Sequence, residues 1–344
     1  MNSVNLSIII PIKVTFQNRF LLNRATKLIQ YFSNFNDIEV ILVDSSQKGK
    51  YSKVLKSLCI EECTSYYFLE MQDIYSAAKA RNYGAKQAKG EYLLFYDVDL
   101  VVKDDFIENV LQDINELSEK AFAIYPCLYL SESKTKLIEG EKLDNQVFED
   151  IKIRYLKGFN DEVLYLAVNT STILVQKNHF FYIGAYNELF KGHGYEDFEL
   201  IHRLYKFSIQ KKLPKDYTID YKTPFPAEYK GFRQYYAFVS LPNLFNQRFT
   251  LHLWHPRPLS KKYYRNRTNN FNEFLNIISK DINMSNISAK TNEYKEFIFN
   301  LLQTYGYNDI ETYCGLFKLN KYSSQNQKKN IYHEKSKKII FKSI

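Results

Sequence analysis

Residues 91–99 read Glu-Tyr-Leu-Leu-Phe-Tyr-Asp-Val-Asp, a short apolar run that ends in two carboxylates. The apolar part is typical of a buried strand, and alternate residues of a strand face the same side. Asp97 and Asp99 are therefore expected to project together where the strand leaves the core. Open α/β sheets bind ligands at the carboxyl ends of their strands, where a divalent cation is often shared between carboxylates and a diphosphate. The alternative is that these acids only solubilise a loop and cap the next helix.

The chain before and after this run alternates between strand-like and helix-like patterns. Residues 6–12 and 38–43 are almost continuous in apolar side chains, as parallel strands covered on both faces are. Residues 18–32, between them, have the apolar spacing of a helix. Further strands are expected at 66–69, 92–96 and 121–125, and further helices at 50–58, 74–89 and 104–118. This alternation predicts a doubly wound α/β sheet, which gathers Asp44, Asp97 and Asp99 at one edge.

Several function classes are disfavoured by what the sequence lacks. No GxGxxG or GxxxxGK[ST] motif follows the first expected strand, which disfavours a Rossmann dinucleotide site and a P-loop. The 4 cysteines form no CxxC pair, which disfavours a zinc site and indicates a reducing, cytosolic compartment. We see no secretion signal and no apolar run near the roughly 20 residues that span a bilayer. The net charge of +9 favours anionic partners, without deciding between nucleic acid, lipid and nucleotide.

A second acid pair follows in residues 191–200, Lys-Gly-His-Gly-Tyr-Glu-Asp-Phe-Glu-Leu. Glu196 and Asp197 are expected at the start of an amphipathic helix, and two glycines precede them. A simple helix cap that complements the helix dipole is one interpretation. The glycines favour another, a backbone that approaches a ligand or moves. Before this motif, residues 131–165 predict an irregular, mobile loop with a helix near 147–155, and residues 170–175 predict a strand.

Residues 250–258, Thr-Leu-His-Leu-Trp-His-Pro-Arg-Pro, carry two histidines around the only tryptophan. In extended backbone His252 and His255 point to opposite faces, so one of them is expected at any one site. A hydrogen-bonded structural histidine is the alternative to a metal ligand. After residue 259 helical patches are expected at 271–280 and 294–303. The Lys-rich residues 328–342 fit either an anionic membrane surface or a solvated, disordered tail.

Taken together and in this order, these motifs resemble the GT-A glycosyltransferases, especially those of the family 2 type. The matching pieces in the first half are Ser7-Ile8-Ile9-Ile10-Pro11, Val43-Asp44-Ser45-Ser46, Ala80-Arg81-Asn82-Tyr83-Gly84 and residues 88–99. Asp97-Val98-Asp99 stands where that family has its DXD motif. Residues 192–197 look like the Gly-Trp-Gly-Gly-Glu-Asp element of β-1,4-galactosyltransferases and of chondroitin-type capsule polymerases. The resemblance covers roughly residues 5–258.

The resemblance implies a fold and a domain organisation. The expected fold is GT-A, a Rossmann-like, doubly wound mixed α/β sheet with a mainly helical C-terminal extension. We expect a glycosyltransferase domain over 1–258, with a nucleotide-sugar half at about 1–130 and an acceptor half at about 131–258. A basic, helical extension follows over 259–344.

The resemblance also implies roles for individual residues. Asp99 and one histidine, His255 in preference to His252, would bind Mn²⁺ or Mg²⁺, and Asp97 would contact the ribose or the same ion. Asp197 would act as the general base, and Glu196 would hold sugar hydroxyls. The residues implied in nucleotide-sugar binding are Pro11, Asp44, Arg81, Asn82, Asp97 and Gly194. Two departures stand out: Ser45 follows Asp44 where the family usually has a second acid, and His193 and Tyr195 replace a tryptophan and a glycine.

The function implied is an inverting, metal-dependent transferase that uses a UDP-sugar, UDP-galactose or UDP-N-acetylgalactosamine. Its expected acceptor is a glycan or lipid-linked glycan of a bacterial surface polysaccharide, such as a capsule or lipopolysaccharide. The expected location is cytoplasmic, with peripheral contact to the inner face of the plasma membrane through the basic C-terminus, and no nucleic-acid partner is expected. Two alternatives stay open: a retaining transferase of related fold, and a non-catalytic glycan- or membrane-binding protein.

Overall fold

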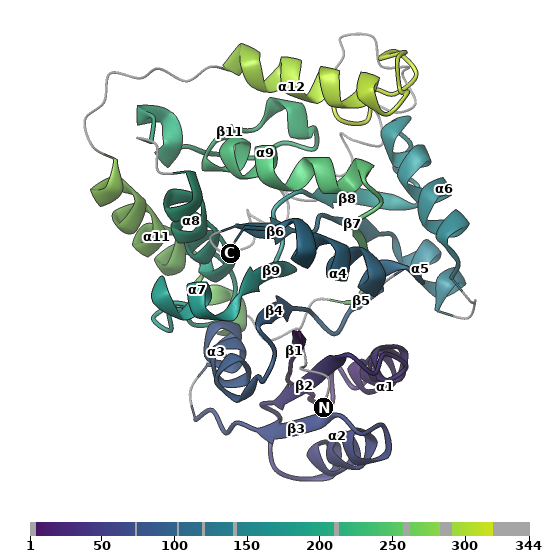
Figure 1. Cartoon of the computed structure of the whole chain (residues 1–344), viewed down its shortest axis with the longest axis vertical. Coiled ribbons are helices and arrows are strands. Elements are labelled where there is room, and N and C mark those ends of the chain that lie inside the picture. Colours follow the sequence, from purple (N-terminus) through teal and green to yellow (C-terminus); the bar gives the residue numbers. More distant parts are fainter. Residues whose placement is uncertain are drawn as a thin grey trace.

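The structure is a computed structural model that describes residues 5–72, 74–101, 103–118, 121–139, 143–209, 213–256, 262–282 and 291–318 (Figure 1). The Lys-rich segment 328–342 lies outside these residues. The strands are β1 (Leu6–Ile12), β2 (Ile38–Asp44), β3 (Ser65–Phe68), β4 (Tyr92–Phe95), β5 (Leu100–Val101), β6 (Phe122–Ile124), β7 (Cys127–Leu130), β8 (Val163–Ala167), β9 (Ile173–Gln176), β10 (Asp220–Tyr221), β11 (Lys230–Gly231) and β12 (Thr250–His252). The helices are α1 (Leu21–Ser33), α2 (Lys50–Glu61), α3 (Ala77–Gln87), α4 (Phe106–Glu116), α5 (Glu132–Ile138), α6 (Asn145–Leu156), α7 (Lys177–Tyr182), α8 (Glu196–Ile209), α9 (Phe232–Phe245), α10 (Lys262–Arg265), α11 (Arg267–Asp281) and α12 (Thr291–Thr304).

The main sheet has the strand order β3-β2-β1-β4-β9-β6. Its first four strands are parallel, while β9 runs antiparallel to both β4 and β6. The mixed, doubly wound sheet expected from the sequence is therefore confirmed. β1, β2 and β4 end side by side, which brings the loops after Ile12, Asp44 and Phe95 to one edge of the sheet.

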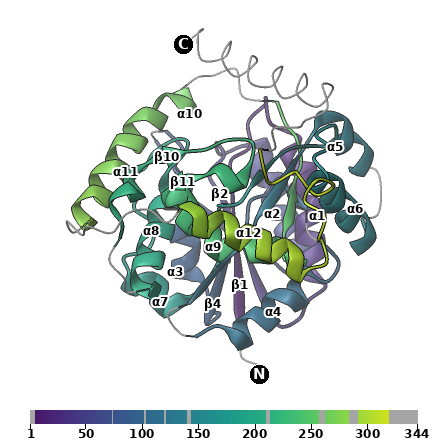
Figure 2. The same cartoon turned by 90° about the horizontal axis from the view of Figure 1, so that it is seen from above.

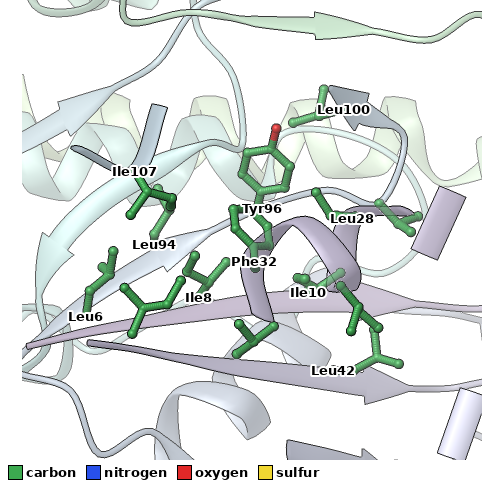
Figure 3. Close-up of a cluster of buried hydrophobic side chains, with 14 of the residues drawn as sticks. Leu6, Ile8, Ile10, Leu28, Phe32, Leu42, Leu94, Tyr96, Leu100 and Ile107 are labelled. Atoms are coloured by element: carbon green, nitrogen blue, oxygen red, sulfur yellow. The ribbon is translucent and has the colours of Figure 1, made fainter. Parts of the chain in front are cut away.

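Side chains on the two faces of this sheet pack into two separate cores. On one face Leu6, Ile8 and Ile10 of β1 meet residues of α1 and α4, such as Phe32 and Ile107 (Figure 3). On the other face the intervening Ile9 packs with residues of α3, α7 and α8. The continuous apolar run of β1 is required because both faces of the strand are buried, as expected for a parallel strand inside a layered α/β fold.

A second sheet, with the order β5-β12-β7-β8, was not predicted from the sequence. β12 pairs antiparallel with β5, so that His252 lies opposite Leu100. On its other side β12 runs parallel to β7. This sheet joins a segment after residue 249 to the residue that directly follows Asp99, and it thereby links two motifs that are far apart in the sequence.

β1 has the bounds 6–12 that the sequence predicts. It tolerates Pro11 near its end because β4 pairs with β1 only as far as Ile9, so the edge of β1 on that side is unpaired at Pro11. Two other expectations need correction. Residues 131–165 are more regular than predicted, since they form α5, α6 and β8. The expected strand at 170–175 begins only at Ile173.

The C-terminal helices expected at 271–280 and 294–303 are present as α11 and α12. They are packed into the rest of the molecule. Phe274 and Ile278 of α11 belong to the core that contains α3 and α8, and Tyr294 and Ile298 of α12 belong to the core beside the second sheet. Both views show α11 beside α8 and α12 along α9 (Figures 1 and 2). The domain boundary at residue 258 stays a prediction.

Candidate active site

Arg81 joins the two acid motifs of the sequence. Its Nη2 lies 2.8 Å from Asp97 Oδ1, and its Nη1 lies 2.8 Å from Asp197 Oδ1. The Arg81 side chain is only 3% exposed, whereas those of Asp97 and Asp197 are 35% and 25% exposed. The guanidinium is therefore buried, whereas the two carboxylates that it joins remain accessible to solvent.

Local packing explains why Arg81 reaches this position. Gly84 lies one helical turn after it in α3, and a Cβ at Gly84 would come within 2.6 Å of the Ile9 side chain. Gly90 likewise contacts the backbone of Ser7, where a Cβ would approach the Ser7 nitrogen to 2.7 Å. These two glycines let α3 and the start of β4 lie directly against β1. Arg81 is therefore held over the end of the sheet where Asp97 emerges.

Two further side chains, which the sequence did not single out, complete this bridge. Ser171 Oγ donates a hydrogen bond of 2.5 Å to Asp97 Oδ2. Tyr186 donates a hydrogen bond of 3.3 Å to Asp197 Oδ1, and its ring centroid lies 5.3 Å from the Arg81 guanidinium. Serine and tyrosine in loops gave no pattern from which these contacts were predictable.

Glu196 and Asp197 begin α8, as predicted, but their surroundings differ. Glu196 is 7% exposed, and its Oε2 has no hydrogen-bond partner among the described residues. Burial, followed by the neighbouring Asp197, raises the pKa of Glu196 to about 8. Burial also raises the pKa of Asp197, although Arg81 opposes this rise. A raised pKa makes a carboxylate a better proton acceptor, which suits Asp197 to base chemistry.

Asp99 lies in a different group, with both histidines of the 250–258 segment. Its Oδ2 is 3.2 Å from His252 Nε2 and 3.3 Å from His255 Nε2. One ligand atom from each of the three residues lies within 4.8 Å of the others. Burial alone would raise the pKa of Asp99, but the histidines, chiefly His252, lower it well below its usual value.

The structure corrects two expectations about this group. Asp97 and Asp99 do not project together from a strand, because β4 ends at Phe95 and the two carboxylates contact different partners. The expectation that only one histidine reaches the site is also wrong. The alternation argument fails because β12 ends at His252, so His255 is not in extended strand.

Neighbouring contacts fix this corner of the molecule. Leu253 N donates to Asp99 O, which continues the pairing of β12 with β5. The buried Arg24 donates to the carbonyl oxygens of Leu253 and Trp254, and so holds the segment between the histidines. The ring of Tyr129 stacks on His252 with centroids 4.0 Å apart and planes 14° apart.

Asp44, at the end of β2, and Asn82, in α3, are also implied in nucleotide-sugar binding, and both already have protein partners. Asp44 is fully buried and accepts hydrogen bonds from Ser46 N and the Tyr66 hydroxyl. The Asn82 amide binds the backbone of Tyr186 and the carboxylate of Glu188, so it fixes the loop that precedes the second acid motif. Their contacts with a nucleotide stay a prediction.

Gly194 belongs to a loop that is clamped from two sides. Gly192 and Gly194 both have positive φ, at 73° and 98°, which favours glycine. Gly192 N donates to Tyr75 O, while His193 N donates to Tyr263 O. The buried Asn270 of α11 donates to the carbonyl oxygens of Lys191 and Gly194. The C-terminal helices therefore hold the loop that positions Glu196 and Asp197.

Comparison with protein families assigns this arrangement. The sequence model described as glycosyltransferase-like family 2 matches residues 7–279. The chain belongs to the glycosyltransferase-like family 2. The match contains every residue of the Arg81 bridge and of the Asp99 group, and it extends through most of α11. The family and the fold class predicted from the sequence are both confirmed.

Curated relatives of this family 2 chain share only part of it. The glycosyltransferase GlyG of Streptococcus pneumoniae serotype 4 is 27% identical over 111 residues, which are 32% of this chain and 35% of that protein. The GalNAc(5)-diNAcBac-PP-undecaprenol β-1,3-glucosyltransferase of Campylobacter jejuni is 31% identical over 111 residues, with the same shares of 32% and 35%. The matched segments thus span about a third of the length of either relative.

Among solved structures, residues 1–349 of S. aureus TarS match 94% of this family 2 chain and 77% of the solved chain, with 12% identity and a TM-score of 0.42. Glucosyl-3-phosphoglycerate synthase of Mycobacterium tuberculosis, solved with Mn²⁺ and UDP, matches 51% of this chain and 57% of its own, with 11% identity and a TM-score of 0.32. Within the described part of the family 2 chain, no helix is both long and apolar enough to cross a membrane.

Proposed function

We propose that this chain is a metal-dependent, inverting glycosyltransferase that transfers a sugar from a UDP-sugar to a glycan acceptor. The observation that carries the proposal is the group of Asp99, His252 and His255 beside the carboxylates that Arg81 bridges. Family membership supports transfer of a sugar. The pairing of a cation site with the accessible Asp197 carboxylate, whose pKa is raised, supports a direct displacement.

The donor set fits a divalent cation. One carboxylate oxygen and two imidazole nitrogens converge within 4.8 Å, and both Nε2 atoms face the same oxygen. Two nitrogen donors favour Mn²⁺ over Mg²⁺, because Mg²⁺ prefers an all-oxygen shell. When bound, such an ion would neutralise negative charge on the diphosphate of the leaving group. Asp97, which already binds Arg81 and Ser171, is assigned to the ribose or to the same ion.

Asp197 is assigned as the general base. It accepts the proton of the acceptor hydroxyl while the hydroxyl oxygen forms a bond to the anomeric carbon. The bond from that carbon to the UDP oxygen breaks, and the displacement inverts the anomeric centre. Arg81 fixes the Asp197 carboxylate through one 2.8 Å contact with Oδ1, and Oδ2 is assigned to the acceptor hydroxyl.

The donor and acceptor are proposed at a coarser level. We propose a UDP-linked galactose or N-acetylgalactosamine as donor, and a bacterial surface polysaccharide or its lipid-linked precursor as acceptor. The support is the resemblance of residues 192–197 to galactosyltransferases, and relatives named for an undecaprenol-linked acceptor and for minor teichoic acid biosynthesis. The Campylobacter jejuni relative with the undecaprenol-linked acceptor is named as a glucosyltransferase, so UDP-glucose belongs in every donor test.

The experiment that tests the proposal measures UDP release without acceptor from UDP-glucose, UDP-galactose and their N-acetylamino forms, with and without Mn²⁺. Slow hydrolysis of one donor that depends on Mn²⁺ is expected, and Asp99→Asn should abolish the dependence. The exposed Asp150→Asn provides a matched control. No release from any donor, together with no thermal shift by UDP and Mn²⁺, would favour the non-catalytic binding protein instead.

A further inference from the structure

Tyr195 directly precedes the acid pair that begins α8, and its backbone has an uncommon conformation. Its φ is 74°, in the left-handed region that residues other than glycine rarely adopt. Gly194 before it has a φ of 98°, so two consecutive left-handed residues turn the chain into the helix. Tyr195 O accepts a hydrogen bond of 2.9 Å from Glu199 N, as the residue before a helix commonly does. The backbone angles at Tyr195 therefore set the direction in which Glu196 and Asp197 leave the loop.

The side chain of Tyr195 is buried, at 7% exposure, and two distant elements hold it. Its hydroxyl donates a hydrogen bond of 2.8 Å to Asp220 Oδ2 of β10. Its ring packs against Phe271 and Phe274 of α11, with centroids 5.1 and 5.8 Å apart. The guanidinium of Arg267, at the start of α11, lies 5.3 Å from the ring centroid. Contacts from β10 and α11 thus converge on the residue before the acid pair.

Asp220 is a fixed acceptor for the Tyr195 hydroxyl. The guanidinium of Arg233, from the start of α9, forms an ion pair with Asp220 and contacts both of its carboxylate oxygens. Asp220 also pairs in the β10–β11 ladder with Gly231, where a Cβ would collide with Ile219 O. Burial, followed by Asp220, raises the pKa of Tyr195 to about 12, so the hydroxyl stays a donor below that pH. The contact is therefore a charge-assisted hydrogen bond to a carboxylate that its own ion pair holds in place.

We propose that Tyr195 is a positioning residue for the reaction: its anchored side chain holds a left-handed backbone that directs Asp197 towards Arg81 and the acceptor. The inference rests on the proposed function and adds to it a residue that touches neither donor nor acceptor. A left-handed conformation costs free energy in any residue with a Cβ, but not in glycine. Such strain persists where the surrounding structure over-determines the conformation, and it commonly occurs at functional sites. The hydrogen bond and the ring contacts of Tyr195 provide that surrounding structure.

The acid pair tolerates little displacement. Arg81 Nη1 lies 2.8 Å from Asp197 Oδ1, and proton transfer to a carboxylate needs a heavy-atom distance of about 2.6 to 3.2 Å. A shift of about 1 Å can lower turnover about 10²-fold. This chain has Tyr195 where the galactosyltransferase element that it resembles has a glycine. Glycine would provide the positive φ without strain but has no side chain to anchor, so substitutions at this position separate strain from anchoring.

The test compares wild type with Tyr195→Phe, Tyr195→Ala and Tyr195→Gly. The Phe variant keeps the ring and loses the hydrogen bond, the Ala variant keeps the strain and loses the anchor, and the Gly variant loses both. Each is measured for hydrolysis of the UDP-sugar that wild type turns over, at saturating Mn²⁺, and for its affinity for UDP with Mn²⁺. We expect turnover to fall about 3- to 10-fold in the Phe variant and about 10²-fold in the other two. Affinity for UDP should stay constant in all three.

Thermal unfolding separates positioning from stability. Tyr195→Gly should unfold about 2 to 4 °C above Tyr195→Ala, because glycine adopts positive φ without strain, while the turnover of the two stays equally low. The control is Tyr205→Phe, at a half-buried tyrosine further along α8 whose ring packs on Tyr217 and Tyr236, and it should keep wild-type turnover. Wild-type turnover in Tyr195→Gly overturns the anchor, and equal stability of the Gly and Ala variants overturns the strain.

Hydrogen exchange distinguishes a failure of this inference from a failure of the proposed function. Backbone amides of residues 192–199 exchange slowly where the loop and the first turn of α8 are held in place. We expect exchange there at least about tenfold faster in Tyr195→Ala and Tyr195→Gly than in wild type, with wild-type exchange in α2. Faster exchange in a protein that neither binds UDP nor hydrolyses any donor supports the anchor and refutes the transferase. Wild-type exchange in both variants overturns the inference, whatever the protein binds.

Discussion

Asp97 and Asp99 are two positions apart, yet the structure gives their carboxylates opposite surroundings. Asp97 faces Arg81, whose guanidinium keeps its charge at every pH that the protein experiences. Asp99 faces His252 and His255, whose neutral imidazole nitrogens are common metal ligands. The first carboxylate is fixed in a permanent ion bridge, and the second is placed to share a cation with its neighbours.

From this difference we propose that one short motif supplies two functions. The Asp97 side extends through Arg81 to Asp197, and so ties the end of β4 to the start of α8. The Asp99 side extends through His252 to the second sheet. We therefore expect substitutions on the Asp97 side to affect turnover and stability, and substitutions on the Asp99 side to affect metal binding.

The largest effect is expected from a pair of variants that divide these functions. Asp197→Asn should lower turnover about 10²- to 10⁴-fold, because the general base is lost, and leave affinity for UDP with Mn²⁺ unchanged. Asp99→Asn should weaken Mn²⁺ binding about 10- to 100-fold or more, since a charged ligand is lost. Donor turnover and titration of Mn²⁺ by electron paramagnetic resonance measure the two effects. If both variants lose the same property, the two sides are not separate.

The next effect concerns the bridge itself. Arg81→Met retains the length of the side chain but leaves Asp97 and Asp197 without their cation. Breaking a buried ion pair costs about 3 to 5 kcal/mol, and because the two carboxylates are partly exposed we expect about 2 to 4 kcal/mol of lost unfolding free energy. Urea unfolding measures it. Lys79→Met, an exposed position in the same helix, is the matched control, and equal stability of the two variants would contradict the bridge.

The side of the molecule around β1, β2 and β4 was predictable from the sequence because its physics is local. The run from Leu6 to Ile12 is apolar throughout, and both faces of that strand are buried. The helix predicted near 147–155 is also encoded locally, because the Asp144 side chain accepts a hydrogen bond from Val147 N and caps the start of α6. Strand ends and helix caps depend on residues that are neighbours in the sequence, so they can be predicted without knowledge of the tertiary fold.

The group at Asp99 was only partly predictable because it depends on pairing between distant segments. β5 has two residues and β12 has three, too few to show a strand pattern. The position of His255 depends on the segment that Arg24 holds, and the contact of Arg24 with Trp254 joins residues 230 positions apart. The sequence indicated the residue types of the site, whereas its geometry came from tertiary contacts.

A smaller effect is expected from pH. Burial raises the pKa of Glu196 from 4.5 to about 8, so the folded protein retains a proton that the unfolded chain releases. This stabilisation is complete below about pH 4.5 and is lost as the pH rises towards 8. Wild type should lose on the order of 2 kcal/mol of unfolding free energy between pH 5 and pH 8, since each pKa unit corresponds to about 1.4 kcal/mol and relaxation reduces the sum.

Urea unfolding at several pH values tests this dependence. Glu196→Gln is neutral throughout and should flatten the profile, whereas the exposed Glu296→Gln should leave it as in wild type. An unchanged slope in Glu196→Gln would mean that Glu196 ionises normally in the folded protein. The pH dependence would then have to come from Asp197 and its ion pair with Arg81.

The smallest effect is expected where stacking orients a proposed metal ligand. Histidine ligands usually donate their second nitrogen to an acceptor, but His252 Nδ1 has no such partner among the described residues. Its ring stacks on Tyr129, and Tyr129 stacks in turn on Tyr165 of β8 at 4.4 Å. Stacking therefore provides, on the Asp99 side, the orientation that Arg81 provides on the Asp97 side.

Replacing the stacked ring tests this last point. Tyr129→Leu should raise the Mn²⁺ dissociation constant about 3- to 10-fold, because His252 gains rotational freedom that binding must remove. Tyr129→Phe retains the aromatic face and should bind Mn²⁺ like wild type, which separates stacking from any effect of the hydroxyl. Equal Mn²⁺ affinity of the Leu and Phe variants would show that the contacts with Asp99 alone orient His252. The two carboxylates would then differ only in their partners and not in how those partners are fixed.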